Sequence, residues 1–291
     1  MEEKLPAYGG QAVIEGVMMR GKSSIAMAVR SPDGEIKVVN EKLTGIYKTN
    51  IFKIPFLRGL VSLWDAFGIG IKYLTLSANF QTGEDEKLEG LPLYLTLGIS
   101  VLIGISLFFL APSALAVWIE KLTGISPGWI NLIEGLIRLT ILLAYLAIVG
   151  RMPDIRRTFA YHGAEHKTIN AFEAGVELTP ETVANQSREH PRCGTSFMLT
   201  LVFISVLLFS LIPPLALHWR LLSRLLLIPF VAGISYEYIR LLARYIDNPV
   251  VRLISRPNLA LQKLTTREPS LDMLEVSIKA FKTMYENEHQ Q

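Results

Sequence analysis

The stretch YHGAEHKTINAFEAG, residues 161–175, concentrates side chains that can do chemistry. His162 and His166 are four positions apart, and Glu165 directly precedes the second histidine. On a helix, side chains four apart lie on one face roughly 6 Å from each other, so both imidazoles can reach one ion. In the inverzincin order His-x-x-Glu-His the histidines hold zinc and the glutamate is a general base. The stretch therefore predicts a metal site on a helix.

A second pair of donors follows in HPRCGTSF, where His190 and Cys193 are three positions apart. Neutral imidazole and thiolate are the ligands that zinc prefers, and the chain has only five histidines and one cysteine. We therefore predict Zn²⁺ as cofactor, with these ligands: His162, His166, His190 and Cys193. Glu173 falls on the same helix face as His166 and can complete the ligand set or orient one of its members.

The predicted site has two interpretations. If all four ligands bind, the zinc has no open position, and such closed sites usually only stabilise a fold. If three bind, water can take the fourth position, its pKa falls to about 7, and Glu165 can accept its proton. A closed site has no need of a carboxylate beside its ligand, so the sequence favours Glu165 as a catalytic residue. A solvated glutamate is the alternative.

Other polar residues are candidates for the site or for a role in the membrane. Glu15 and Arg20 lie in a glycine-rich N-terminal segment and could approach the metal or a substrate, or simply line a turn. Glu237 lies near the cytoplasmic end of the last apolar stretch, where it could face the metal or reach the headgroups. Glu134 and Arg138 are four apart in an apolar stretch, so they can pair within one helix.

The composition indicates a membrane protein. Half of the 291 residues are hydrophobic (50%), and the mean hydropathy of +0.34 is too high for an ordinary soluble domain of this length. A bilayer core needs roughly 20 apolar residues per spanning helix. Four stretches meet that need: residues 91–118, 129–149, 197–217 and 221–242. We predict an α-helical membrane protein with about four transmembrane helices.

Loop charges predict the orientation. Basic residues crowd the loop between the second and third stretches, whereas the loop between the first two offers Lys121 alone. By the positive-inside rule, the central loop and both termini are cytoplasmic. Cys193 is the only cysteine, which excludes an intrachain disulfide and suits a reducing compartment. The net charge of +3 does not argue for nucleic acid, so membrane lipid is the expected partner, and a homo-oligomer is possible.

The remaining segments predict a cytoplasmic α+β part with a small antiparallel sheet. Within residues 1–54, Pro32-Asp33-Gly34 separates two alternating runs and predicts a hairpin, and YGGQAVIEGVMMRG predicts one further strand. Residues 55–90 predict a helix followed by the acidic linker TGEDEKLEG. The other units are residues 91–150 and 197–246 as transmembrane pairs, 151–196 as the metal-site loop, and 247–291 as a helical tail.

Two amphipathic helices belong to these segments. Arg58, Asp65 and Lys72 recur every seven positions in the helix of residues 55–80, which predicts a narrow polar stripe. This helix either lies in the inner leaflet or is half-buried against the bundle. The tail helix spaces Leu271, Leu274, Ile278 and Phe281 at helical intervals, and we expect this apolar face to pack against the cytoplasmic part.

Six segments across the chain resemble one protein family. GGQAVIEGVMMRG, RSPDGEI, RGLVSLWDA, YHGAEHKTINAFEAG, HPRCGTSF and LTTREPSLDMLEVSI are similar to the YqhQ-like family of bacterial membrane proteins, described as predicted metal-dependent enzymes. The resemblance implies a bacterial inner-membrane location and a metal, without naming a reaction. It supports the following as site residues: His162, Glu165, His166, His190 and Cys193.

Three functions follow in order of preference. The first is a zinc-dependent hydrolase at the cytoplasmic face of the membrane, acting on a membrane-associated peptide, lipid or amide with Glu165 as general base. The second is a non-enzymatic scaffold or assembly factor in which zinc only fixes the central loop. A transporter or channel is the third, weakened by the scarcity of charge in the first and third apolar stretches.

Overall fold

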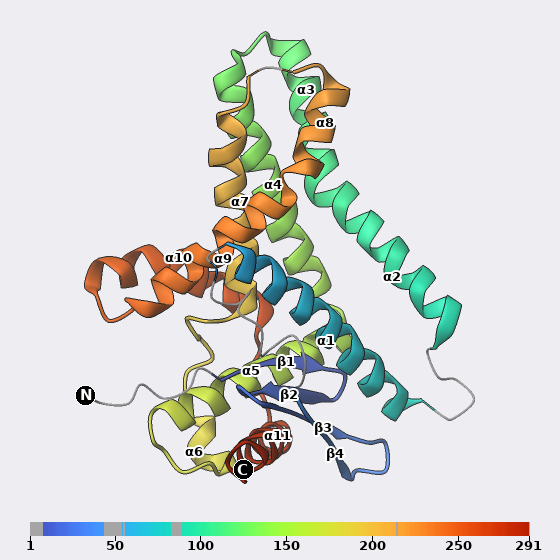
Figure 1. The fold of residues 1–291 in the computed structure, drawn as a ribbon, viewed down its shortest axis with the longest axis vertical. Coiled ribbons are helices and arrows are strands. Elements are labelled where there is room, and N and C mark those ends of the chain that lie inside the picture. Colours follow the sequence, from blue (N-terminus) through green and yellow to red (C-terminus); the bar gives the residue numbers. More distant parts are fainter. Residues whose placement is uncertain (1–7, 44–53, 55, 83–88, 214, 291) are drawn as a thin grey trace.

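The computed structural model describes residues 8–43, 54, 56–82, 89–213 and 215–290 and shows a mostly helical protein with one small sheet (Figure 1). Helices α3, α4, α7 and α8 form a bundle at one end, at the top of Figure 1. The sheet lies at the other end with α5, α6 and α11, and α1, α9 and α10 lie between the two ends. The predicted combination of a helical protein and a small antiparallel sheet is confirmed.

The sheet has four antiparallel strands in the order β1-β2-β3-β4. Their bounds are β1 Gly9–Val13, β2 Gly16–Arg20, β3 Ser24–Arg30 and β4 Ile36–Lys42. The segment expected to be one strand is therefore the β1-β2 hairpin, whose turn contains Glu15 at φ 53. The turn predicted at Pro32-Asp33-Gly34 joins β3 to β4, and Gly34 adopts φ 89, a conformation that glycine takes without strain.

Strand alternation gives the sheet two apolar faces. On one face, Val17 and Met19 pack against α5 (Pro153–Glu173) and α11 (Leu271–His289). On the other, Met18 packs toward α1 (Leu57–Gln81). Because successive strand residues point to opposite faces, one run of apolar residues supplies both layers.

The tail helix α11 packs on this core as expected, with one exception. Leu274, Ile278 and Phe281 are buried against the sheet and α5. Leu271 is 51% exposed, because it is the first residue of the helix and lies before the part that covers the sheet. The predicted apolar face is therefore one turn shorter than its spacing indicated.

Helix α1 combines features of both interpretations made from the sequence. Tyr73 is buried against the sheet, whereas Trp64 is 79% exposed and Phe67 is 52% exposed. The basic residues form ion pairs, Arg58 with Glu237 and Lys72 with Glu41. The side chain of Asp65 and linker residues 83–88 lie outside the described residues.

Two helices are long and apolar enough to cross a membrane, or three if a bent pair counts as one span, among the residues that the structure describes. The first runs over 34 residues as α2 Gly90–Ile105, a π-helical turn Ser106–Leu110 and α3 Ala111–Thr123. The second is α4 Pro127–Val149. The bent pair, α8 Leu217–Leu226 and α9 Ile228–Arg244, meets at 44°.

The predicted count of four transmembrane helices is thus not confirmed. The third apolar stretch forms α7 Gly194–Ser210, which has 17 residues and is short for a spanning helix. The fourth is divided between α8 and α9, where Pro229 in the first turn of α9 lacks the N–H needed to continue the α8 hydrogen-bond ladder.

Two later parts of the chain return to α5. Helix α6 (Pro180–Ala184) follows α5, and α10 (Pro249–Thr265) leads to a segment that crosses α5 at Gly163. A Cβ on Gly163 would lie 2.2 Å from the carbonyl oxygen of Arg267, so only glycine permits this approach. The Arg267 N–H donates to the Phe159 carbonyl at 2.8 Å, which fixes the crossing beside the histidines.

Candidate metal centre

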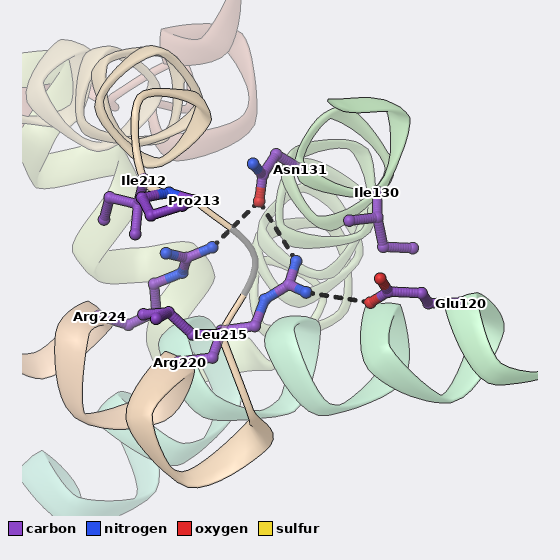
Figure 2. A pocket seen from close by; sticks show the side chains of 8 residues that line it. All are labelled: Glu120, Ile130, Asn131, Ile212, Pro213, Leu215, Arg220 and Arg224. Carbon is purple, nitrogen blue, oxygen red and sulfur yellow. Dashed lines mark hydrogen bonds and ion pairs between the residues drawn. The ribbon is translucent and has the colours of Figure 1, made fainter. Parts of the chain in front are cut away.

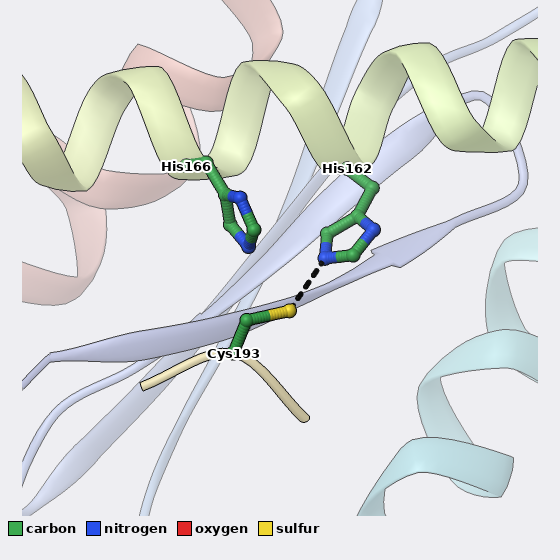
Figure 3. A group of neighbouring side chains, drawn as sticks. All are labelled: His162, His166 and Cys193. Atoms are coloured by element: carbon green, nitrogen blue, oxygen red, sulfur yellow. Dashed lines mark hydrogen bonds between the residues drawn. The ribbon is translucent and has the colours of Figure 1, made fainter. Parts of the chain in front are cut away.

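Three of the predicted ligands converge. His162 and His166 point from α5 toward Cys193, which is the N-cap residue of α7 (Figure 3). One donor atom from each residue lies within 4.8 Å of the other two, and Cys193 Sγ is 3.3 Å from His162 Nε2. With metal–donor distances of about 2.0–2.3 Å, the 3.3 Å spacing suits two ligands of one ion, and the third donor is close enough to join them after a small shift of its side chain.

Backbone carbonyls hold both imidazole rings. His162 Nδ1 is 2.8 Å from the Thr265 carbonyl oxygen, and His166 Nδ1 contacts the carbonyl oxygen of Arg188. A carbonyl only accepts, so each Nδ1 carries a proton, and in the neutral ring Nε2 then offers its lone pair. This arrangement is typical of histidines that bind a metal through Nε2. The two rings therefore fit a metal ion.

Cys193 lies at the N-terminus of α7. The Thr195 N–H, in the first turn of α7, is 3.4 Å from Sγ, and the helix N-terminus favours negative charge. The residue is only 7% exposed. The same geometry places a thiol beside an oriented imidazole, which is also the arrangement of a cysteine nucleophile with its base.

Glu165 lies buried beside the three donors. It is 5% exposed, and its Oε2 is 3.8 Å from His162 Nε2. Burial raises the pKa of Glu165, while the nearby His162 and a hydrogen bond from the Gly10 N–H partly oppose that rise. A carboxylate with a raised pKa is a better proton acceptor near neutral pH.

Strand β1 makes room for this carboxylate. A Cβ on Gly10 would lie 2.9 Å from Glu165 Cγ and 2.7 Å from the Met18 carbonyl oxygen. Gly10 also lines a cavity of about 350 Å³. Other residues lining this cavity are Gln11, Met18, Arg20, Ile69 and Arg192. The cavity approaches the cluster through Gly10, which lies against Glu165, and through Arg192, which precedes Cys193, although none of the three donors lines it.

His190 lies next to the three donors but outside their group. Its ring centroid is 5.8 Å from that of His166, and Gln262 holds its backbone through hydrogen bonds of 2.8 and 2.9 Å. Its Nε2 is buried without a hydrogen-bond partner and lies 3.5 Å from Glu173 Oε2. Burial holds the pKa of His190 below its usual value, so the ring is neutral.

The additional candidates are engaged elsewhere. Glu173 forms an ion pair with Arg192, and Glu15 accepts two hydrogen bonds from Arg157 at 2.5 Å. Glu237 pairs with Arg58 and accepts from the Phe56 N–H at 3.2 Å. None of these three carboxylates belongs to the converging group found in the described part of the chain.

Sequence reasoning missed the groups that orient the donors. The Thr265 and Arg188 carbonyls leave no trace in residue type, because every residue has one. Gln262 carried a weak signal at most, since it follows the apolar run LAL, and its complete burial is known only from the structure. Gly10 belongs to the motif GGQAVIEGVMMRG, but its contact with Glu165 depends on how β1 crosses α5.

Fold and site together define a mostly helical protein with apolar helices long enough to cross a membrane and a buried His-His-Cys cluster. Residues 54–287 match the model of a family described as Protein of unknown function (DUF1385), and the chain belongs to that family. It is also 40% identical to the Uncharacterized protein YqhQ of Bacillus subtilis (strain 168), over 95% of this chain and 91% of that protein. No solved structure matches. Membership confirms the resemblance, but a metal-dependent activity does not follow from it.

Proposed function

We propose that this protein is a zinc-dependent hydrolase at the cytoplasmic face of the bacterial inner membrane, acting on a membrane-associated peptide, lipid or amide. The observation that carries the proposal is the convergence of His162, His166 and Cys193 with both rings anchored through Nδ1. Three protein ligands leave a tetrahedral zinc with one open position, as in catalytic sites.

Glu165 is the proposed general base. Zinc would lower the pKa of a water to about 7 and polarise the scissile carbonyl. Glu165 would accept the proton of that water and pass it to the leaving group, which a buried carboxylate with a raised pKa can do. The Thr265 and Arg188 carbonyls hold the histidines in place during the reaction, and the adjoining cavity of about 350 Å³ would receive the substrate.

We propose four membrane crossings, formed by α2–α3, α4, α7 and the bent pair α8–α9. Helix α7 rises about 26 Å over its 17 residues and lies along α4 in Figure 1, which suits a crossing at a thin part of the bilayer. Basic loop residues support a cytoplasmic location for both termini and the metal centre in this proposal.

The end of the molecule that holds the sheet with α5, α6 and α11 is called the base. Two helices between the bundle and the base mark the proposed membrane surface. On α1, Trp64 is 79% exposed, and on α10, Leu253 is 59% and Ile254 48% exposed. Such outward apolar side chains suit helices lying in the headgroup region. Ile69 of α1 lines the cavity, so the proposed substrate cavity lies next to the proposed membrane surface.

Zinc content and product formation test the proposal together. Purified wild type and Glu165→Gln should each hold about one zinc per chain by mass spectrometry, because Glu165 is not a ligand. Membrane extracts of cells expressing wild type should contain a hydrolysis product that is absent with Glu165→Gln. His166→Ala should lose both zinc and product, whereas His289→Ala, at the exposed end of α11, should lose neither.

A non-enzymatic scaffold with a closed zinc site is the second candidate. His190 is a candidate fourth ligand, because its ring lies beside His166 and its buried Nε2 has no closer polar contact than Glu173 Oε2 at 3.5 Å. X-ray absorption at the zinc edge separates the two candidates. One sulfur, two nitrogens and one oxygen support the hydrolase, whereas one sulfur and three nitrogens, with Glu165→Gln behaving like wild type, support the scaffold.

A further inference from the structure

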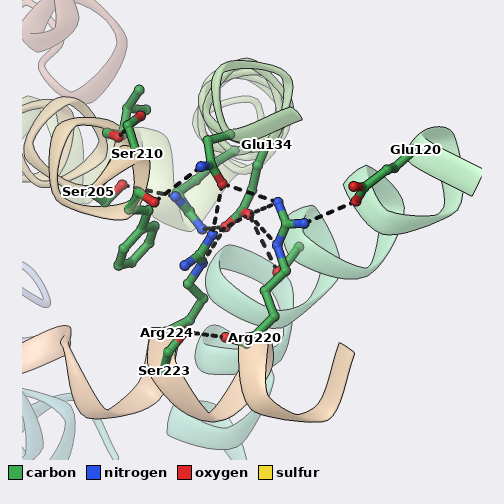
Figure 4. A network of polar contacts seen from close by, with 12 residues as sticks. Glu120, Glu134, Ser205, Ser210, Arg220, Ser223 and Arg224 are labelled. Carbon is green, nitrogen blue, oxygen red and sulfur yellow. Dashed lines mark hydrogen bonds and ion pairs between the residues drawn. The ribbon is translucent and has the colours of Figure 1, made fainter. Parts of the chain in front are cut away.

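A second buried polar cluster lies at the far end of the helix bundle from the metal centre. Glu134 of α4 is 1% exposed, and its carboxylate accepts hydrogen bonds from three guanidinium groups (Figure 4). The donors are Arg138 Nη2 at 2.9 Å, Arg220 Nη2 at 3.1 Å and Arg224 Nη2 at 2.9 Å. These arginines are 1%, 5% and 1% exposed, so their guanidinium groups are buried between the helices.

The positions of the arginines follow from their spacing on α8 and from a missing backbone hydrogen bond in the α2–α3 helix. Arg220 and Arg224 are four apart and share one face of α8. Pro112 has no N–H, so the Phe108 carbonyl four residues earlier loses its usual helical partner. Arg138 Nε donates to this carbonyl at 2.8 Å, and Phe108 lies in the π-helical turn. Arg138 is therefore held in place by a gap in the α2–α3 helix.

The cluster carries more positive than negative charge. Three guanidinium groups face two carboxylates, those of Glu134 and Glu120. The Glu120 side chain is 29% exposed, and its Oε2 lies 3.3 Å from Arg220 Nη1. One positive charge is left over, since arginine does not lose its proton in proteins. The other partners, Asn131 Oδ1 and Ser205 Oγ, are neutral. An uncompensated charge among apolar helices is costly, so a further anion would stabilise the cluster.

A cavity beside the arginines has room for that anion. Its volume is about 30 Å³, and Arg220, Arg224, Asn131 and Glu120 line it (Figure 2). Its remaining walls are Ile130, Ile212, Pro213 and Leu215. One water needs about 10–15 Å³ measured in this way, so the cavity holds one small ion or one terminal group of a larger molecule.

We propose that Arg220 and Arg224 bind a compact anion in this cavity, either a halide ion or a non-bridging phosphate oxygen of an anionic lipid headgroup. The anion would supply the negative charge that the buried cluster lacks. The proposal does not rest on the hydrolase, because the site lies at the opposite end of the bundle and shares no residue with the metal centre.

Thermal unfolding of the purified full chain tests the binding. In zwitterionic detergent at constant ionic strength, replacing gluconate by chloride should raise the unfolding midpoint of wild type by several degrees, because a ligand that binds only the folded state stabilises it. Gluconate is too large for the cavity. In a second arm without halide, nanodiscs of anionic phospholipid should produce the same rise relative to phosphatidylcholine if the anion comes from lipid.

Two variants identify the site. Asn131→Asp places a carboxylate where the Asn131 oxygen accepts from both arginines at 3.2 Å, so it supplies the missing charge internally. Arg220→Gln removes the surplus charge. Both should unfold at a midpoint that no longer depends on chloride or anionic lipid. Asn185→Asp, an exposed position at the end of α6, makes the same substitution elsewhere and should keep the wild-type response.

Either arm supports the proposal if its effect is lost in the two variants. A response to chloride alone identifies a halide site, and a response to anionic lipid alone identifies a headgroup site. If neither variant folds, bromide-soaked crystals of wild type should show an anomalous peak beside Arg220 and Arg224. A wild-type midpoint that is equal in all conditions, variants that respond as wild type does, or bromide crystals without that peak overturn the proposal.

Discussion

The two polar clusters of this protein differ in the sign of the ion that their side chains favour. At the base, two imidazoles and a thiol converge, and these are donor groups that suit a cation. In the bundle, guanidinium groups outnumber carboxylates, which is an arrangement for an anion. The comparison teaches that the side chains of a buried cluster indicate the sign of the ion it favours. Acceptor atoms favour a cation, and N–H donors in excess of carboxylates favour an anion.

The largest effect is expected from the bundle. Glu134→Gln should lower the free energy of unfolding by about 3–5 kcal/mol, because it leaves buried arginines without their carboxylate partner. Glu120→Gln, at the exposed edge of the same cluster, should cost less than about 1 kcal/mol. Unfolding in mixed micelles with increasing denaturing detergent measures both. Equal losses would show that burial does not set the strength of this cluster.

Removing a ligand at the base should come next. Cys193→Ala should lower the zinc content from about one per chain to near zero and remove the fall in unfolding midpoint that a chelator causes in wild type. Cys193→Asp, which keeps an anionic ligand, should retain zinc. If Cys193→Ala keeps its zinc, the sulfur is not a ligand, and a thiol nucleophile oriented by His162 would better explain their 3.3 Å contact.

Adjacent glycines give a sharper comparison within the base. Gly10→Ala should cost about 1–3 kcal/mol and displace Glu165, since its Cβ would meet both the Glu165 side chain and a β2 carbonyl. Gly9→Ala, where a Cβ would meet nothing within 4 Å, should be nearly neutral. Chemical unfolding of the two variants side by side checks this, and similar losses would contradict the close approach of β1 to α5.

A surface ion pair should show the smallest effect. Lys72 and Glu41 are 2.5 Å apart, with side chains 55% and 37% exposed. Lys72→Met should change the free energy of unfolding by about 0.2–1 kcal/mol at low salt and less at high salt, because solvent screens the pair. A loss as large as that of Glu134→Gln would show that α1 depends on this pair for its position on the sheet.

Short-range patterns predicted parts of each region correctly. The spacing of His162 and His166 placed both rings on one helix face, and the turn at Pro32-Asp33-Gly34 joined two strands as expected. The number of membrane crossings was less predictable, because a break such as that before Pro229 divides an apolar stretch without changing its composition. The pairing of Glu134 with Arg138 was also predicted.

These short-range patterns could not predict contacts between residues that are far apart in the sequence. Arg220 and Arg224 lie about ninety positions from Glu134 along the chain, and nothing in their own segment indicates a shared carboxylate. The prediction that all four zinc ligands lie together likewise depended on how the loop of residues 151–196 folds, which its sequence pattern does not specify. The structure brings three of them together and leaves His190 beside Glu173.

The sequence by itself determined the local elements: apolar helices, a small sheet with two apolar faces, and a helix carrying two imidazoles on one side. These follow from residue type and from periods of 3.6 and 2, which act over a few residues. Only the tertiary structure decided that Cys193 meets the histidines, that carbonyls of Thr265 and Arg188 orient them, and that one glutamate receives three arginines. Those contacts depend on where the chain returns after long excursions, which the packing of whole helices sets.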